Sequence, residues 1–225
     1  MATVFSIFDY YPIRQIIEST KPYSLSAVPG REAEPEPLLT RLTGVRYVPD
    51  LGTLTTGVFT TPNITLVNRS WSLFDRGNFY GPNFQYKEYM SVRNSLTGLI
   101  VHYALIFGMA SLALPPVRWL LKKFLHQPGE GPSRESAAKD RIEYRAIATA
   151  DTKEKQRAYA RFCFGGGAYH LTGILMAEAA ITILRDNTAA HGMGGGFLTP
   201  ATLGQAFIDR LGKAGATLET HMLNH

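Results

Sequence analysis

The chain has 225 residues, of which 45% are hydrophobic and 18% charged, which is enough to bury a hydrophobic core. Its single cysteine, Cys163, excludes an intrachain disulfide, and its first residues lack the basic segment of a secretory signal, so we expect a cytoplasmic protein. The net charge of +5 arises within residues 118–161, which hold 11 Lys or Arg against 6 Asp or Glu, without a nucleic-acid-binding signature. We predict one compact unit that does not bind nucleic acid.

The first 89 residues predict a mixture of short elements. Residues 3–18 favour a helix that is interrupted at Pro12, and residues 22–40 form a loop rich in Pro and Glu. The Val, Thr, Tyr and Phe content of residues 44–68 predicts several short strands. Residues 70–89 are aromatic-rich and predict a loop with a short helix packed on that sheet.

Residues 96–125 form an apolar segment followed by a basic one. No formal charge occurs from Leu96 to Val117, and Arg118, Lys122 and Lys123 follow, with Trp119 among them. A stretch of this length approaches what a membrane span needs, but Pro115 and Pro116 near its end disfavour one. Three interpretations stay open: a helix associated peripherally with a membrane, a helix buried in the core, and a true span. The basic part is typical of an interfacial amphipathic helix.

The C-terminal part predicts a hairpin and two helices. After a loop at residues 127–139, residues 142–147 and 158–164 favour paired strands, and residues 171–185 a helix. Thr199 is the predicted cap of a last helix that starts at Pro200 and places Leu203, Phe207 and Leu211 on one face. His221 and His225 are assigned to a frayed terminus. The fold class is therefore α+β, a mixed or antiparallel sheet covered by helices, with a membrane-associating helical segment.

Dinucleotide and metal sites are not expected in this chain. A Rossmann fingerprint needs Gly-x-Gly-x-x-Gly between a strand and a helix, and His170 or Phe197 stands where the third glycine would be. The histidines show no spacing typical of zinc ligands. We predict that this chain alone binds no nicotinamide cofactor and no metal.

Five segments carry a resemblance to a known family. They are Val67-Asn-Arg-Ser70, Tyr80-Gly-Pro-Asn-Phe-Gln-Tyr86 with Glu88-Tyr89, Pro128-Gly-Glu-Gly-Pro-Ser133, Gly165-Gly-Gly-Ala-Tyr-His-Leu-Thr-Gly173 and Gly194-Gly-Gly-Phe-Leu-Thr-Pro-Ala-Thr-Leu-Gly204. In this order they resemble the saccharopine-dehydrogenase-like oxidoreductases, which include trans-acting enoyl reductases of polyketide or lipid assembly in specialised metabolism. The resemblance implies that residues 1–225 form the substrate and oligomerisation half, closed by a helical unit at 165–219, without the nucleotide-binding half.

The resemblance also implies partners. The substrate would be an apolar small molecule, NADPH would require a separate Rossmann chain, and the protein would form a homodimer or pair with that chain. Peripheral attachment to an internal membrane or lipid droplet is a further expectation from residues 96–125.

The candidate site residues fall in two groups. In the C-terminal group, the amides of Gly166 and Gly167 open a helix and could bind a polarised carbonyl, with Tyr169 and His170 beside them as proton donors. Each has a structural alternative, a tight turn for the glycines and a hydrogen-bonded cap for His170.

The second group comes from the resembling segments. Arg69 could pair with a substrate carboxylate, and Tyr80 and Tyr86 could line the substrate site, although a structural arginine and core aromatics are the alternatives.

Three functions are compatible with these residues. The first is an enoyl-reductase-like oxidoreductase acting on an apolar substrate. The second is a cofactor-independent isomerase or cyclase on a polyketide- or terpenoid-like substrate, in which Tyr169, His170 or Glu178 transfers protons. The third is a noncatalytic, membrane-associated assembly protein.

Overall fold

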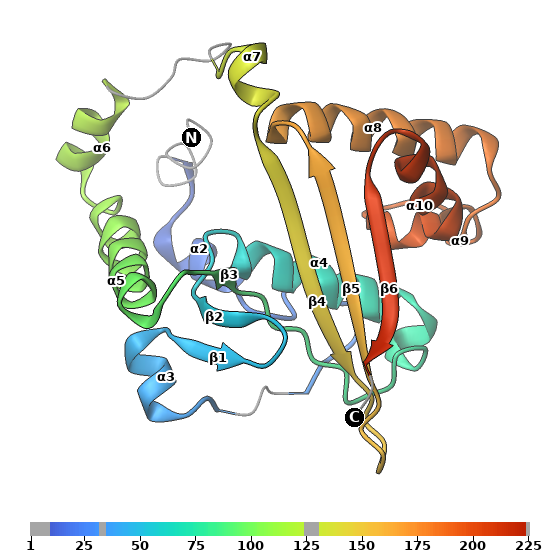
Figure 1. Ribbon diagram of the computed structural model, residues 1–225, viewed down its shortest axis with the longest axis horizontal. Helices are drawn as coiled ribbons and strands as arrows, with labels where there is room; N and C mark the ends of the chain where they lie inside the picture. Colours follow the sequence, from blue (N-terminus) through green and yellow to red (C-terminus); the bar gives the residue numbers. More distant parts are fainter. Residues whose placement is uncertain (1–9, 32–34, 124–130, 224–225) are drawn as a thin grey trace. The chain divides into compact units, whose positions relative to one another are not determined.

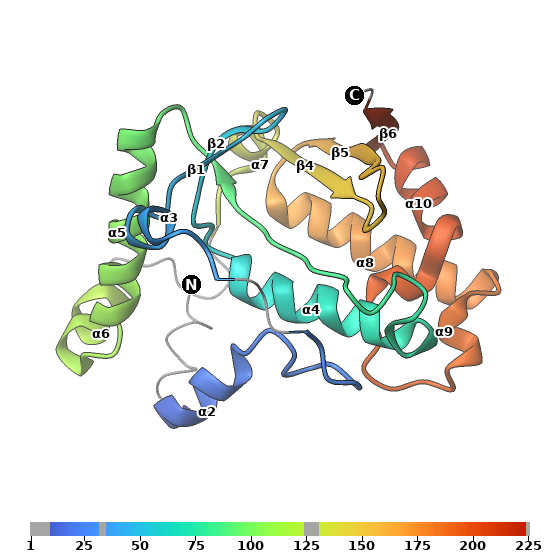
Figure 2. The same ribbon diagram turned by 90° about the horizontal axis from the view of Figure 1, so that it is seen from below.

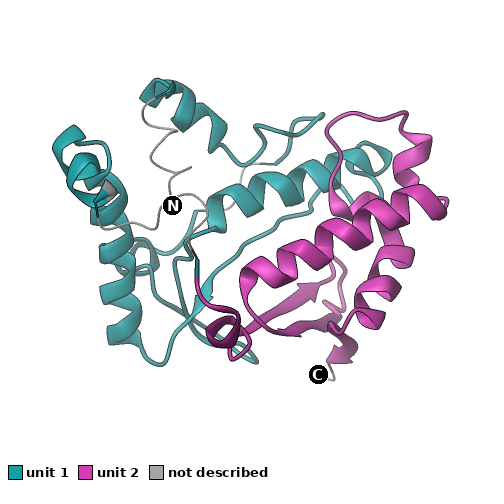
Figure 3. Ribbon diagram, turned by 90° about the horizontal axis from the view of Figure 1, so that it is seen from above, with its two compact units in different colours: residues 1–131 teal, residues 132–225 magenta. Residues whose placement is uncertain are grey.

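The computed structural model describes residues 10–31, 35–123 and 131–223, and the chain forms two compact units (Figures 1 and 3). Unit 1 comprises residues 1–131 and unit 2 residues 132–225. This differs from the single compact unit expected from the sequence. The predicted helical residues 3–9 and the end of the basic segment, residues 124–125, lie outside the described ranges.

Unit 1 combines a three-stranded antiparallel sheet with helices (Figure 2). Its strands pair in the order β1-β2-β3, with Arg46 opposite Leu54 and Leu54 opposite Ser91. The predicted helix after Pro12 is confirmed by α2. In chain order the elements are α2 (Ile13–Ser19), α3 (Leu38–Thr43), β1 (Arg46–Val48), β2 (Gly52–Thr55), α4 (Thr60–Leu73), η1 (Asp75–Gly77), β3 (Met90–Ser91), α5 (Ser95–Ser111) and α6 (Pro115–Lys122).

Helix α4 corrects the prediction of strands as far as residue 68. Its buried residues, Thr65, Asn68, Trp71 and Ser72, recur every three or four positions, as on one side of a helix. Three of these four are polar and hydrogen-bonded, since Asn68 donates to the Pro22 carbonyl and Ser72 accepts from the Ala27 amide. An analysis of apolar periodicity therefore misses the helix, and its β-branched composition suggests strands instead.

Helix α5 contacts the sheet through a narrow strip near its start. A Cβ at Gly98 would lie 2.9 Å from the Val45 side chain, so the missing side chain permits close approach. One turn later, buried His102 bonds the Thr56 hydroxyl through Nδ1 at 2.8 Å. From Ile106 to Ala110 the helix is exposed on all sides. The second half of α5 therefore lies outside the core of unit 1.

Helices α5 and α6 together carry the apolar segment and its basic end. Within the described ranges, no single helix combines the length and apolar character that a bilayer crossing requires. Helices α5 and α6 meet those criteria only as a pair, and the chain bends by 108° between them.

Unit 2 is a three-stranded antiparallel sheet with helices. The predicted hairpin is confirmed by β4 and β5, which pair Ile142 with Phe164. The third strand, β6, was missed: His221 lies on it rather than at a frayed end, and its ring lies 5.0 Å from that of Tyr159. His225 lies outside the described residues. The elements are α7 (Arg134–Ala137), β4 (Arg141–Thr149), β5 (Arg157–Gly165), α8 (Ala168–Arg185), α9 (Ala189–Gly192), η2 (Pro200–Leu203), α10 (Gly204–Lys213) and β6 (Thr217–Leu223).

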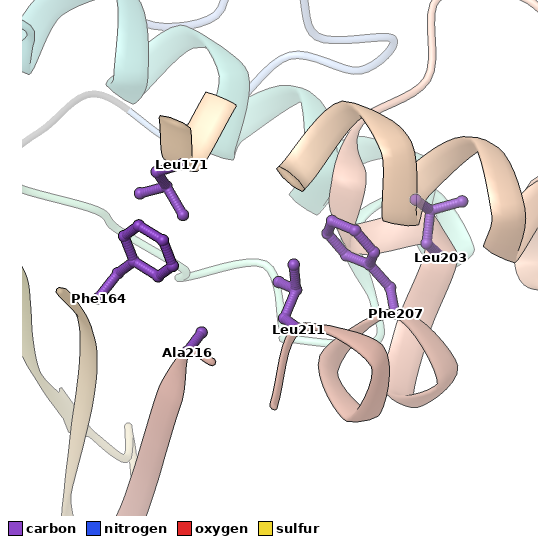
Figure 4. Close-up of a cluster of buried hydrophobic side chains, with 6 residues drawn as sticks. All are labelled: Phe164, Leu171, Leu203, Phe207, Leu211 and Ala216. Atoms are coloured by element: carbon purple, nitrogen blue, oxygen red, sulfur yellow. The ribbon is translucent and has the colours of Figure 1, made fainter. Parts of the chain in front are cut away.

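The core of unit 2 lies between the sheet and helices α8 and α10 (Figure 4). The predicted apolar face of the last helix is confirmed, and Thr199 and Pro200 occupy the cap and first helical positions. The last helix begins as the 3-10 turn η2, and Gly204, with φ of 63°, joins η2 to α10. The buried cluster consists of Phe164, Leu171, Leu203, Phe207, Leu211 and Ala216. The α+β class and the antiparallel sheets are confirmed.

Candidate functional site

A cavity of about 520 Å³ in unit 1 is the candidate functional site. Its volume lies in the range of small-molecule sites, about 300–1,000 Å³. The walls come from the loop that precedes α3, from α4 and from the segment that leads into β3. The lining residues are Pro22, Tyr23, Gly30, Glu36, Thr60, Ile64, Asn68, Gln85, Tyr86, Lys87, Glu88 and Tyr89.

One polar cluster in the cavity is centred on the Glu36 carboxylate. Its Oε2 pairs with the Arg46 guanidinium, and its Oε1 accepts a hydrogen bond from the Tyr89 hydroxyl at 3.1 Å. The Arg46 guanidinium also lies 3.8 Å from the centre of the Tyr89 ring, a cation–π arrangement. Lys87 Nζ lies 3.6 Å from Glu36 Oε1. One carboxylate thus joins two cations and a phenol at the wall of the cavity.

The protonation states of this cluster follow from its contacts. Burial alone would raise the pKa of Glu36, but the hydrogen bond and charge of Arg46, the hydrogen bond from Tyr89 and the charge of Lys87 leave it below the ordinary value of 4.5. Burial raises the pKa of Tyr89 from 10.0 to about 12, with the Glu36 charge adding to the rise and the Arg46 charge opposing it. At neutral pH the pair is a carboxylate and a protonated phenol.

A second polar cluster surrounds Glu88. The Tyr86 hydroxyl donates to Glu88 Oε2 at 2.8 Å, and Asn63 Nδ2 donates to Glu88 Oε1 at 2.9 Å. The Thr60 hydroxyl, at the start of α4, donates to the Glu88 backbone carbonyl at 3.2 Å. These bonds attach the segment that carries Tyr86 to the first turns of α4. The position of the Tyr86 phenol is therefore set by a helix rather than by a loop alone.

The remaining wall is aromatic and apolar around Tyr23 and Ile64. A Cβ at Gly30 would lie 2.0 Å from the Tyr23 ring, so a glycine is required where the ring packs. The Tyr23 ring also meets Trp71 edge to face, with centroids 6.0 Å apart. Burial raises the pKa of Tyr23 above its ordinary value. Such a wall suits an apolar ligand.

Asn68 is the most buried polar residue lining the cavity, with 3% of its surface exposed. Its Nδ2 donates to the Pro22 carbonyl at 2.8 Å, whereas its Oδ1 has no hydrogen-bond partner among the described residues. A buried acceptor left unpaired is unfavourable by about 1–3 kcal/mol. A ligand or water with an N–H or O–H group could satisfy it.

The predicted residues of unit 1 have different positions. Tyr86 lines the cavity. The Arg69 guanidinium donates to the Leu25 carbonyl at 3.2 Å, a structural contact. The Tyr80 ring lies in an aromatic cluster, 4.8 Å from that of Phe79 and 5.7 Å from that of Phe84. The structural alternatives stated for Arg69 and Tyr80 therefore describe their observed contacts.

The glycine turn of unit 2 is packed rather than open. The Gly166 amide donates to the Asp140 carbonyl at 2.8 Å, and a Cβ at Gly167 would lie 2.9 Å from that of Ala137. Both glycines are buried. The expectation that the amides of this turn are available to a ligand is therefore wrong for Gly166.

The proposed proton donors on α8 are not gathered at one point. Tyr169 is 76% exposed, and exposed His170 packs edge to face on Phe164, with ring centroids 5.5 Å apart. Glu178 follows His170 by eight residues, about 12 Å along a helix. Its carboxylate lies 3.8 Å from Arg210 Nη1. The geometry does not bring Glu178 to His170, so the three candidate residues do not form one site.

The glycine turn also fails as a dinucleotide cradle. It does join a strand, β5, to a helix, α8, as in a Rossmann turn. However, β5 pairs antiparallel with both β4 and β6, whereas the Rossmann site lies at the end of parallel strands. The Gly166 amide is already used, and Asp186 beyond α8 bonds Arg210 at 3.0 Å. These residues do not fit a nicotinamide dinucleotide. Within the described ranges, no group of three His, Cys, Asp or Glu is arranged to hold a metal.

Sequence reasoning missed most of the cavity. Glu36 stands in a loop that was expected to be solvated, and Asn68 in a region that was expected to be a strand. The hydrogen bond between Tyr89 and Glu36 spans 53 positions, which no local pattern reveals. One signal was present, because Glu88 and Tyr89 follow Tyr86 in a resembling segment.

The known proteins that are similar to this chain share one name. No protein-family model matches this chain, and no solved structure does. Similar proteins named trans-acting enoyl reductases occur in Mycobacterium tuberculosis, at 34% identity over 215 residues (90% of this chain, 50% of the relative), and in Mycobacterium bovis, at 29% over 218 residues (91% and 51%). Another from Mycobacterium ulcerans is 27% identical over 215 residues (90% and 50%).

The similarity extends over nearly all of this chain, and the similar proteins are named as reductases. More particularly, the proteins it resembles carry the name trans-acting enoyl reductase. The chain spans about half the length of the curated relatives that it matches.

Proposed function

We propose that this chain is the substrate-binding part of an enoyl-reductase-like oxidoreductase acting on an apolar acyl substrate of polyketide or lipid metabolism. The observation that carries the proposal is the 34% identity to a trans-acting enoyl reductase over 90% of the chain. The unit 1 cavity supports it, because an apolar wall faces a small set of polar groups there. In this proposal the acyl chain lies along Tyr23 and Ile64.

The polar groups have a role in the proposed reaction. Reduction of an enoyl thioester adds hydride to the β-carbon and a proton to the α-carbon. Between these two steps, negative charge develops on the carbonyl oxygen of the thioester. A nicotinamide supplies hydride, and we place it on a separate Rossmann chain or segment. The Lys87 ammonium is a donor at the cavity that can stabilise that oxygen, and the Tyr86 phenol, whose single O–H is donated to Glu88 Oε2, joins it by turning that O–H toward the ligand. Glu88 and Glu36 hold these donors in position.

A binding experiment tests the site without the hydride donor. Trp71 contacts Tyr23, so its fluorescence should change when an enoyl N-acetylcysteamine thioester enters the cavity. We expect Tyr86→Phe to weaken binding about tenfold, the effect of one hydrogen bond. Tyr80→Phe is the matched control, because Tyr80 lies in the same aromatic segment but does not line the cavity. Equal effects of the two changes, or saturation at unrelated sites only, would reject the cavity as the acyl site.

The cofactor part of the proposal has its own test. We expect calorimetric titration of the pure chain with NADPH or NADH to show binding no tighter than about millimolar, equivalent to roughly 4 kcal/mol. Micromolar binding by this chain alone would contradict the separate-donor proposal. Turnover of an enoyl thioester with NADPH and no second chain would do the same. No observation of the structure favours the isomerase or cyclase over the reductase.

A further inference from the structure

We propose that helices α5 and α6 dock unit 1 onto the surface of an anionic lipid bilayer. The docking surface, here called the α5–α6 apolar face, consists of Ile100, Ile106, Phe107, Met109, Trp119 and Leu120, all of them exposed. This inference is independent of the proposed reaction.

The first observation is that an apolar helix extends beyond its own core. Helix α5 holds no charged residue, yet its buried residues are Gly98 and His102, both in its first half. From Ile106 to Ala110 every residue is exposed, and Phe107 is exposed by 67%. A helix that is apolar on all sides is normally surrounded, either by a protein core or by lipid. A bilayer can enclose the end of a helix from several sides, which a flat protein partner cannot.

The second observation is the geometry of the bend between the helices. The Arg118 guanidinium of α6 donates to the carbonyls of Leu112 and Ala113 at 2.7 and 3.1 Å, and thereby caps the end of α5. The two helices meet at 108°. If α5 enters the bilayer with its uncharged end, α6 lies across that direction, near the plane of the headgroups. An interfacial helix adopts this orientation.

The third observation is charge complementarity. No acidic residue occurs between Glu88 and Glu130, whereas the same stretch contains Arg93, Arg118, Lys122 and Lys123. Lys123 Nζ lies 3.6 Å from the centre of the Trp119 ring, so a cation and an interfacial aromatic occupy one spot on α6. Two copies of this face would bring like charges together. Anionic headgroups, in contrast, would neutralise them.

Helix α3 extends the same apolar region. The Tyr103 hydroxyl of α5 donates to the Leu42 carbonyl at 3.0 Å, and Figure 2 shows α3 beside α5. Leu38 and Leu39 on α3 are 70% and 73% exposed. An apolar region of two helices with a basic rim is larger than the isolated exposed side chains of ordinary surfaces.

The test is co-sedimentation of the full chain with vesicles that contain phosphatidylserine, compared with purely phosphatidylcholine vesicles. We expect binding to the anionic vesicles, weakened by salt, with a blue shift of Trp119 fluorescence. Replacing Lys122 and Lys123 with Glu should lower the partition coefficient at least ~30-fold, since each lost cation near the surface contributes roughly a factor of five and the two added carboxylates repel anionic headgroups. Lys153→Glu with Lys155→Glu is the matched control, because it changes the net charge equally in the β4–β5 turn of unit 2.

An apolar pair of variants separates insertion from simple charge attraction. Phe107→Gln should reduce binding at least tenfold, whereas Met176→Gln, at an equally exposed site on α8, should leave it unchanged. Three results would overturn the proposal: no vesicle binding at low salt, equal loss in the control variants, or a concentration-dependent dimer that Phe107→Gln dissociates. The last result would assign the α5–α6 apolar face to a second copy of the chain.

Discussion

Replacing Glu36 with Gln is expected to destabilise unit 1 in a way that depends on pH. The change keeps the shape of the side chain but removes the charge that pairs with Arg46 and Lys87. It also weakens the hydrogen bond from Tyr89, because a neutral amide oxygen is a poorer acceptor than a carboxylate. The guanidinium of Arg46 stays in place, with its side chain only 19% exposed, and loses its counter-charge.

The magnitude follows from the burial of the pair. A charge-assisted hydrogen bond contributes about 1.5–3 kcal/mol, and removing one partner of a fully buried pair costs roughly 3–5 kcal/mol. The Glu36 side chain is 29% exposed, so solvent screens part of this. We therefore expect a loss of about 2 kcal/mol at neutral pH. The pKa of Glu36 is lowered by folding, so its contribution is present above the ordinary value of 4.5 and is lost as the pH falls through the lower, folded value.

The assay is urea unfolding of unit 1. Both tryptophans, Trp71 and Trp119, lie in unit 1, so their fluorescence reports that unit. The free-energy difference between wild type and variant should be about 2 kcal/mol at neutral pH and should shrink as the pH falls below 4.5 and through the lowered, folded pKa of Glu36. Glu18→Gln is the control: Glu18 also pairs with a lysine, at 2.6 Å, but both side chains are more than half exposed, and the change should cost under about 0.5 kcal/mol. A loss as small as the control's, or one that does not vary with pH, would refute the assigned role of the cluster.

Three further changes test single contacts. Tyr89→Phe should abolish a loss of stability that the wild type shows at high pH. Because folding raises the pKa of Tyr89, the wild type is stabilised below pH 10.0 and loses this stabilisation as the pH rises through about 12. Urea unfolding at high pH measures the difference between wild type and variant. Gly44→Ala should lower the unfolding free energy by about 2 kcal/mol or more, since φ is 66° and the new Cβ would lie 2.2 Å from the His102 ring; an unchanged midpoint would contradict that packing. His170→Ala should cost no more than about 1 kcal/mol, the value of its edge contact with Phe164, and a larger thermal shift would indicate a further structural role.

The sequence predicts those elements whose buried side chains are apolar. The hairpin of β4 and β5 and the last helix follow this rule, since Phe164, Phe207 and Leu211 are both apolar and buried. Helix α4 does not, because it presents mainly Thr, Asn and Ser inward and its stability depends on hydrogen bonds to a distant loop. Helix α5 departs from this rule in the opposite way, because it is apolar but most of its residues are exposed. The hydropathy of a segment shows which environment its side chains favour, but not whether the fold buries them.

Only those residues of the candidate site that belong to a recognisable sequence segment could be predicted. Tyr86 was found because it belongs to a recognisable segment, and it lines the cavity. Glu36 acquires its role from Arg46, Lys87 and Tyr89, which stand 10, 51 and 53 positions away. One glutamate among three in a Pro-rich stretch has no local signature of such a cluster. The fold has to bring the three partners together before the carboxylate is distinguishable from a solvated one.

The glycine turn between β5 and α8 shows why a local pattern does not define a cofactor site. A strand, a glycine-rich turn and a helix follow one another there, in the order found at a dinucleotide site. The surrounding residues exclude such a site. The Asp140 carbonyl accepts the hydrogen bond of the Gly166 amide, Ala137 fills the space beside Gly167, and the sheet is antiparallel. A phosphate would have to displace the Asp140 carbonyl to reach the Gly166 amide. The turn therefore has a structural role in unit 2, and we propose that the hydride donor is bound by a separate Rossmann chain or segment.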